Sequence, residues 1–248
     1  MRIALIDADI TAFASAVAVE KSIDWGDGIW TLHADEDEGK KLFSDSIARV
    51  KENAGADKVI LAFSDSHNFR KDVLPTYKAN RAGSRQPLIR RALTDWAEEE
   101  YECYVRPGLE GDDVLGILAT MQRKGKAAKD EYIICTIDKD LKTVPGLHYN
   151  MGKDEFFEVT VEEADRWHLF QALTGDTTDN YAGCPGCGPV KANRILDQDC
   201  SWAAVVAAYE KAGFSEEEAL VQARVARICR ADDYDFKKKQ VRLWTPPN

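Results

Sequence analysis

The chain has 248 residues, of which 44% are hydrophobic, and 33 basic against 43 acidic side chains give it a formal net charge of −10. This apolar content suffices for a packed core and excludes a disordered chain, and no apolar run reaches the roughly 18–20 residues that span a bilayer. The net charge alone argues against nucleic-acid binding, because phosphates are bound by Lys and Arg, so the distribution of charge has to decide.

Short apolar runs alternate with amphipathic stretches over the first 160 residues. Runs rich in Ile, Val and aromatic residues predict buried strands over 3–6, 58–63, 101–105 and 132–137. Between them, the spacing of apolar residues predicts helices over 35–53, 88–99 and 112–123. This alternation favours an α/β fold with a mostly parallel central sheet and flanking helices.

After about residue 160 the predicted strands largely stop. Helices are predicted over 161–173, 189–196, 201–212 and 215–229, and Ser215 with Glu218 forms a plausible capping box for the last of them. The tail 234–244 alternates weakly and suggests one further strand. We therefore expect an α/β core over 1–160 and a helical region over 161–248.

Acidic side chains follow the predicted strands. They are Asp7 and Asp9 after the first strand, Asp65 after the second, Asp138 and Asp140 after the fourth, and Glu110, Asp112 and Asp113 at the start of the helix after the third. The carboxyl ends of parallel strands converge on one edge of a sheet, where ligands bind. Asp176 and Asp179 add a fifth group at the junction with the helical region.

Each of these acids has an ordinary explanation when it is taken alone. Asp9 suits a helix N-cap, Glu110, Asp112 and Asp113 suit the positive end of a helix, and Asp138 and Asp140 suit a turn. Together they would bring about eight negative charges within a few ångströms, which repel one another unless cations are present. Oxygen ligands without His or Cys favour Mg²⁺ or Mn²⁺ over zinc. Two such ions about 4 Å apart can activate a water and stabilise the leaving oxygen in phosphodiester hydrolysis.

A basic segment follows Asp65. Residues 70–91 contain one acid, Asp72, and seven basic side chains, which are Arg70, Lys71, Lys78, Arg81, Arg85, Arg90 and Arg91. An isolated basic run is most simply a solvated loop, but cations beside a metal–carboxylate centre can hold a phosphate. Tyr77, in the same segment, offers a face on which a terminal base can stack.

A Gly/Pro-rich turn over 183–189 is similar to the turn of a helix–hairpin–helix element. Its glycines, Gly183, Gly186 and Gly188, permit a tight turn whose N–H groups can meet phosphate, and Lys191 and Arg194 follow on the next helix. The turn also holds a Cys-x-x-Cys pair. A zinc site needs a second pair of ligands at suitable spacing, and a redox pair needs a strand-then-helix setting, so neither is expected. The six cysteines suit reduced thiols.

The ordered set of motifs resembles the flap endonuclease and 5′→3′ exonuclease family, in particular the exonucleases of short-tailed lytic coliphages. The segments that carry the resemblance are Leu-Ile-Asp-Ala-Asp (5–9), Ala-Phe-Ser-Asp-Ser (62–66), Phe-Arg-Lys (69–71), Tyr-Lys-Ala-Asn-Arg (77–81), Leu-Glu-Gly-Asp-Asp-Val (109–114), Asp-Lys-Asp-Leu (138–141) and Gly-Asp-Thr-Thr-Asp-Asn-Tyr-Ala-Gly (175–183). They cover nearly the whole chain.

The resemblance implies a role for each matching residue. The implied ligands of two Mg²⁺ or Mn²⁺ ions are Asp7, Asp65, Glu110, Asp112, Asp113, Asp138, Asp140, Asp176 and Asp179. The implied phosphate-handling residues are Arg70, Lys78 and Arg81, and the implied DNA contacts are Tyr77, Lys71, Arg85, the three turn glycines, Lys191 and Arg194. The resemblance also implies an arch over the site, formed from about 70–108, and K⁺ bound by carbonyls of the turn.

The implied substrates are duplex DNA with 5′ ends or flaps, and RNA in RNA–DNA hybrids. We expect a monomer that does not associate with a membrane and is located in the cytoplasm, or in the host cytoplasm if the protein is phage-encoded. A single-stranded DNA-binding protein and the replisome are the candidate partners. Two alternatives stay open. A ribonuclease of the PIN type would keep the acids but lack the turn and the basic arch, and a non-catalytic DNA-binding relative would have lost its acids.

Overall fold

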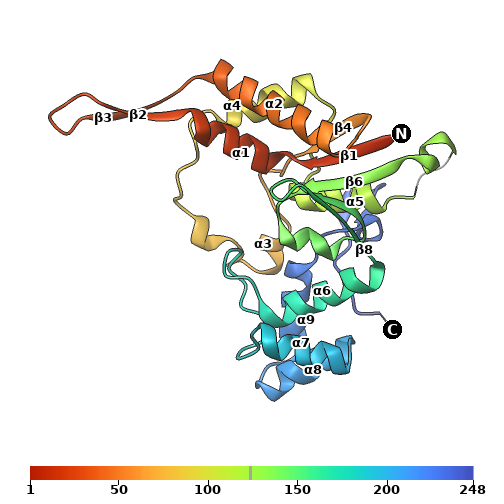
Figure 1. The fold of residues 1–248 in the computed structure, drawn as a ribbon. Helices are drawn as coiled ribbons and strands as arrows, with labels where there is room; N and C mark the ends of the chain where they lie inside the picture. The colour runs from red at the N-terminus through yellow and green to blue at the C-terminus, as the bar shows by residue number, and fades with distance from the viewer. Residues whose placement is uncertain (123–124, 248) are drawn as a thin grey trace.

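The structure, a computed structural model, describes residues 1–122 and 125–247. A six-stranded sheet forms its centre, with helices on both faces and a further group of helices at one end (Figure 1). In spatial order the strands are β5 (Cys103–Tyr104), β4 (Lys58–Ala62), β1 (Arg2–Asp7), β6 (Glu131–Thr136), β7 (Gly146–Asn150) and β8 (Glu155–Val159). Neighbouring strands are parallel except β7 and β8, so the predicted mostly parallel sheet is confirmed.

Successive side chains along the buried strands point to opposite faces of the sheet and so contribute to two separate cores. In β1, Ile3 and Leu5 point into a cluster with Leu115 and Ile134, whereas Ile6 points into the opposite cluster with its neighbours Ala4 and Leu61. Helices α1 (Ala8–Val19), α2 (Glu36–Asn53) and α4 (Arg90–Glu100) pack on one another above the sheet, and α5 (Gly111–Thr120) packs against β1, β4 and β6. The three central strands β1, β4 and β6 are thereby held between apolar layers.

Helices α6 (Val161–Thr174), α7 (Pro189–Gln198), α8 (Trp202–Lys211) and α9 (Glu216–Ala226) form the predicted helical region. They enclose their own core, which includes Leu173, Leu196 and Tyr209. Figure 1 shows this group below the sheet, and the predicted capping box of Ser215 and Glu218 is present at the start of α9. Among the described residues no helix is long and apolar enough to cross a membrane.

The residues after α9 return to the sheet. Ile228, Cys229 and Tyr234 are buried in the same cluster as Ile3 and Leu5. Part of the predicted helical region over 161–248 therefore packs in the core of the sheet and not in the core that α6–α9 enclose. The single strand predicted over 234–244 is instead a short antiparallel ribbon of β9 (Tyr234–Asp235) and β10 (Gln240–Val241).

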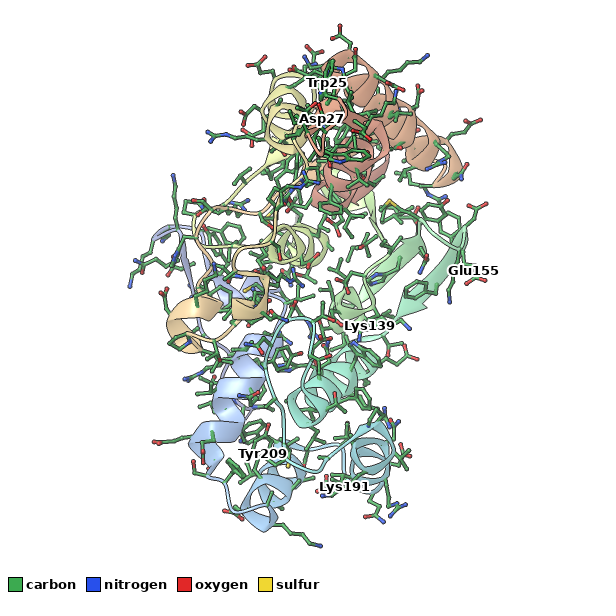
Figure 2. The ribbon with its side chains drawn as sticks, turned by 90° about the vertical axis from the view of Figure 1, so that its left-hand side faces the viewer. Trp25, Asp27, Lys139, Glu155, Lys191 and Tyr209 are labelled. Atoms are coloured by element: carbon green, nitrogen blue, oxygen red, sulfur yellow. The ribbon has the colours of Figure 1, made fainter. Side chains whose placement is uncertain are left out.

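Several elements carry no clear signal in the sequence. The predicted strands and helices are found within a few residues, but α1 and the pair β7–β8 were not predicted, and α5 ends at Thr120 where a helix was expected to 123, a residue outside the described part. A second ribbon, β2 (Glu20–Asp24) and β3 (Trp30–Ala34), leaves the body and exposes Trp25 and Trp30 (Figures 1 and 2).

The remaining short elements are α3 (Arg70–Val73) and the 3-10 turns Ala79–Arg81, Gly125–Lys129, Lys139–Thr143 and Ala231–Asp233. The predicted arch over 70–108 is shorter than expected. Leu93 and Ala97 of α4 are fully buried and pack with α1 and α2, and Cys103–Tyr104 joins the sheet. Only the connection 74–89 between α3 and α4 remains outside the layers, on the left in Figure 1.

Candidate active site

A pocket of about 330 Å³ lies at the carboxyl ends of the central strands, where the sheet meets the helical region. Its acidic lining residues are Asp7, Asp9, Glu110, Asp112, Asp138, Asp140 and Asp179, and its basic ones are Arg70, Lys78, Arg81 and Arg90. Six of the nine predicted metal ligands are in this list. Asp7 ends β1, and Asp138 and Asp140 follow β6, the neighbouring strand, as the strand-end argument predicts.

Two loops close the pocket on the side of the helical region. The Lys78 N–H donates to the Asp179 carbonyl over 2.8 Å, and the Asn180 amide donates to the Thr76 carbonyl over 2.7 Å. Lys78 has a φ of +54°, a left-handed conformation that a non-glycine residue adopts at a cost. This backbone directs its ammonium group to the carboxylates of Glu110 and Asp179, with Nζ 3.7 Å from the Asp179 Oδ2.

Burial and mutual repulsion act strongly on the acids of the pocket. Burial, together with the nearby Asp9, raises the pKa of Asp7 to about 7. Burial and Asp138 likewise raise the pKa of Asp140 to about 7. For Asp112, burial and then Asp7 raise the pKa well above its ordinary value. Buried carboxylates that repel one another are stabilised in their charged form by a nearby cation, so the all-oxygen lining fits a hard divalent ion.

The acids nevertheless do not form a finished coordination sphere. Within 1–122 and 125–247, no group of three or more His, Cys, Asp or Glu side chains is arranged so that it could hold a metal ion. Several of the acids form ion pairs with basic side chains instead. Arg81 lies 2.6 Å from Asp179, and Arg90 lies 2.9 Å from Asp9. Metal ions could therefore bind only if these side chains move.

Three of the predicted ligands do not line the pocket. The Asp65 carboxylate accepts hydrogen bonds from the N–H groups of Ser66 and Gly108, at 2.7 and 2.8 Å, and so holds the loop after β4. Asp176 accepts from the Thr178 N–H at 2.6 Å and lies 3.4 Å from the Lys139 ammonium, beside the pocket. Its charge still reaches the site, because it helps to raise the pKa of Asp140.

Asp113, the third, is fully buried and binds Arg70. The guanidinium donates to both carboxylate oxygens, at 2.7 and 2.8 Å, and also to the carbonyls of Val225 and Arg227. With Glu110 at 3.4 Å from its Nη1, Arg70 has no N–H group left for a phosphate. The roles of Asp113 as a metal ligand and of Arg70 as a phosphate contact stay predictions, and in this structure the pair joins α3, α5 and the end of α9.

Tyr77 lines the pocket but is largely covered by its neighbours. Only 3% of its surface is exposed, so stacking on a terminal base, which stays a prediction, would require its ring to be uncovered. Its hydroxyl donates toward Glu110 and Asp179, 2.9 Å from each carboxylate. Arg85 pairs with Glu20 at the base of the β2–β3 ribbon, outside the pocket, whereas Lys71 is exposed.

The Gly/Pro turn lies in the helical region, where Figure 2 labels Lys191. Pro189 is the first residue of α7, and Cys184 and Cys187 are buried among apolar residues as free thiols. The Gly183 N–H donates to the Gln222 side chain at 2.9 Å and is not free for phosphate. Gly186 and Gly188 have open space around them, and Arg194 is exposed.

Several pocket residues were not assigned a role from the sequence. Asp9 lies in the first turn of α1 and not at its N-cap, and its carboxylate accepts from the Ser64 N–H at 2.8 Å. Arg90 was counted only as part of the basic segment. Gln171 and Tyr181 carry no local signal, because they reach the pocket through the packing of α6 and the loop after it.

Comparison with known proteins agrees with this geometry. Residues 2–165 match the family described as 5'-3' exonuclease, N-terminal resolvase-like domain. The chain is 32% identical to the exodeoxyribonuclease of Enterobacteria phage T3 and to the exonuclease of Escherichia phage T7, with 98% of this chain and 93% of each relative covered.

Among solved structures, the D15 protein of T5 co-crystallised with metal ions matches with a TM-score of 0.66 and 14% identity, over 91% of this chain and 89% of the other. That likeness shows the same fold. The family match and the near-full-length relatives identify the chain as an enzyme of the 5′–3′ exonuclease family.

Proposed function

We propose that the protein hydrolyses phosphodiester bonds at the 5′ ends and 5′ flaps of duplex DNA. The observation that carries the proposal is the pocket at the strand ends, where seven carboxylates face four basic side chains. An anionic backbone needs cations to enter such a site, and hydrolysis needs groups that can hold metal ions beside it. The T3 and T7 relatives, named exodeoxyribonuclease and exonuclease, support this assignment.

Two Mg²⁺ or Mn²⁺ ions fit the donor set. Asp7, Asp112 and Asp138 would hold one ion, and Asp140 and Asp179 chiefly the other. When bound, such ions supply an activated water and stabilise the leaving oxygen. Lys78 and Arg81 now neutralise Glu110 and Asp179, so their release on metal binding would leave two cations for the scissile phosphate. T5 flap endonuclease, which has the same fold, has been crystallised with DNA and metal ions.

The proposal extends to removal of RNA from RNA–DNA hybrids and to a grip on the duplex by the 183–189 turn. The turn's open glycines and the exposed Arg194 suit a phosphate backbone. Carbonyls of the turn would hold K⁺, although Lys191 at present donates to the Gly186 carbonyl at 3.3 Å. A single-stranded DNA-binding protein is the proposed protein partner.

Asp138→Ala tests the proposal. In Mg²⁺, wild type should cut a 5′-flap DNA and a blunt duplex from the 5′ end, and the variant should bind both but cut neither. Asp45→Ala, which removes an exposed carboxylate on α2, should cut like wild type. Preference for single-stranded RNA would favour the PIN-type alternative. Absence of cleavage, together with no heat of Mn²⁺ binding in calorimetry, would favour the non-catalytic relative.

A further inference from the structure

The C-terminal ribbon carries an unpaired positive charge. Its turn consists of Lys237, Lys238 and Lys239, three consecutive lysines that are all exposed. None of the three forms an ion pair with a carboxylate anywhere in 1–122 or 125–247. In a chain with a formal net charge of −10, such a cluster opposes the overall charge and is not explained by solubility alone.

The one acid within the ribbon strands is already paired. Asp235 pairs with Arg242 at 3.1 Å, and its other oxygen accepts the N–H groups of Lys237 and Lys238, both at 3.0 Å. The three lysines therefore have no ion-pair partner on the two strands that they connect.

A fourth cation is fixed beside the ribbon. The guanidinium of Arg106 lies 5.7 Å from the ring of Tyr104, 5.5 Å from Tyr234 and 5.7 Å from Phe236. No carboxylate of the described residues pairs with it, and its Nε is buried without a hydrogen-bond partner, as is the Tyr234 hydroxyl. Aromatic rings hold an arginine by cation–π attraction while leaving its charge unneutralised. Phe236 directly precedes the three lysines, so Arg106 lies against the turn that carries them.

The backbone of the turn supports a role for the lysine side chains. Lys239 has a φ of +54°, a conformation in which glycine is the residue of lowest cost. The backbone conformation of the turn therefore does not explain why a lysine stands at this position. The ribbon is anchored, because Tyr234 and Val241 pack in the same cluster as Phe69 and Tyr104.

We propose that Arg106 and the 237–239 turn, here called the ribbon surface, bind the phosphodiester backbone of DNA outside the pocket. The inference rests on the proposed function, which supplies DNA as the ligand. Phe69 joins the ribbon to the segment that enters the pocket, and Lys71, two residues on, is exposed. The ribbon therefore packs in the same cluster as the residue that directly precedes the basic segment of 70–91, and in this proposal a bound strand contacts both.

The experiment compares two triple variants with the same change in net charge. Lys237→Gln/Lys238→Gln/Lys239→Gln removes the turn lysines, and Lys41→Gln/Lys51→Gln/Lys211→Gln removes exposed lysines of α2 and α8. Kd is measured in EDTA at several salt concentrations, for a blunt duplex and for the same duplex with a 5′ single-stranded flap. Arg106→Gln is compared with Arg106→Lys, which keeps the charge.

The ribbon variant should bind more weakly than the control. The slope of log Kd against log salt should fall by about 0.9 for each lost contact on duplex DNA, or about 0.7 on a single strand. An effect on both DNAs assigns the surface to the duplex, and an effect on the flap DNA alone assigns it to the single strand. If the two triple variants have equal Kd and slope, the inference is overturned. Cleavage by wild type in Mg²⁺ is scored separately, so loss of the proposed function would be seen without affecting this result.

Discussion

The guanidinium of Arg70 and the carboxylate of Asp113 form a bidentate ion pair in which both side chains are buried. The pair joins α3 to the start of α5, and Arg70 also binds two carbonyls at the end of α9. It therefore connects three segments that surround the pocket, although neither residue need touch the substrate.

Arg70→Met should lower the free energy of unfolding by about 3–5 kcal/mol, because it leaves the Asp113 carboxylate buried without its partner. Asp95→Asn, which breaks the exposed pair of Arg91 and Asp95, should cost under about 0.5 kcal/mol. Urea unfolding in EDTA measures both. Wild-type stability in Arg70→Met, with loss of activity alone, would instead restore Arg70 as a phosphate ligand.

Gly183 and Gly186 provide a matched test of the 183–189 turn. Both have positive φ, +65° and +67°, but a Cβ on Gly183 would lie 2.3 Å from the Gly175 backbone nitrogen, whereas one on Gly186 would meet nothing within 4 Å. Gly186→Ala should therefore cost about 1–2 kcal/mol of stability, and Gly183→Ala at least about 2 kcal/mol more. Thermal unfolding decides, and equal costs would contradict the close packing of the turn.

Tyr77→Phe removes a hydroxyl and keeps the aromatic ring. Because this hydroxyl lies 2.9 Å from both Glu110 and Asp179, the variant should lose about 1–3 kcal/mol of stability in EDTA and should cut DNA more slowly at unchanged KM. Tyr181→Phe is the control for stability, since no hydrogen bond to the Tyr181 hydroxyl is found within the described residues. If Tyr77→Phe has wild-type stability and activity while Tyr77→Ala binds 5′ ends poorly, base stacking would be supported instead.

The raised pKa of Asp7 makes stability depend on pH. Without metal the folded carboxyl has a pKa of about 7, against an ordinary value of 3.8, so the folded state retains the proton longer than the unfolded state. Wild-type stability should therefore fall as the pH rises through about 4 to 7. Asp7→Asn lacks this titration, so its stability relative to wild type should increase across that window and then level off. Urea unfolding in EDTA measures this difference, and a difference that does not change with pH would contradict the shift.

The strand ends of this fold were predictable because β1, β4 and β6 are short apolar runs with an acid at their end or within three residues of it. The placement of Asp7, Asp138 and Asp140 in one pocket follows from that pattern. The β7–β8 pair was missed because it mixes polar and aromatic residues, with Phe156 and Glu158 on an outer strand, and gives no buried run. Its position is decided by pairing with β6 through β7.

The partners of charged residues could not be read from the sequence. Arg70 and Lys78 belong to the same basic segment, yet Arg70 is fully buried against Asp113 while Lys78 faces the pocket acids. Whether an arginine meets a phosphate or a buried carboxylate depends on the distance between α3 and α5, which is set by tertiary packing. The hydrogen bonds that nearby amides donate to Asp65 and Asp176 could not be predicted for the same reason, and the role of these two residues as ligands stays a prediction.

The return of residues 228–234 to the sheet makes the pocket depend on a segment that lies mostly outside it. The layer that covers Ile3 and Leu5 includes Ile228, Cys229 and Tyr234. A chain truncated before α9 ends would lose both this covering and the two carbonyl partners of Arg70. Integrity of the pocket therefore requires residues such as Tyr234, which do not line it.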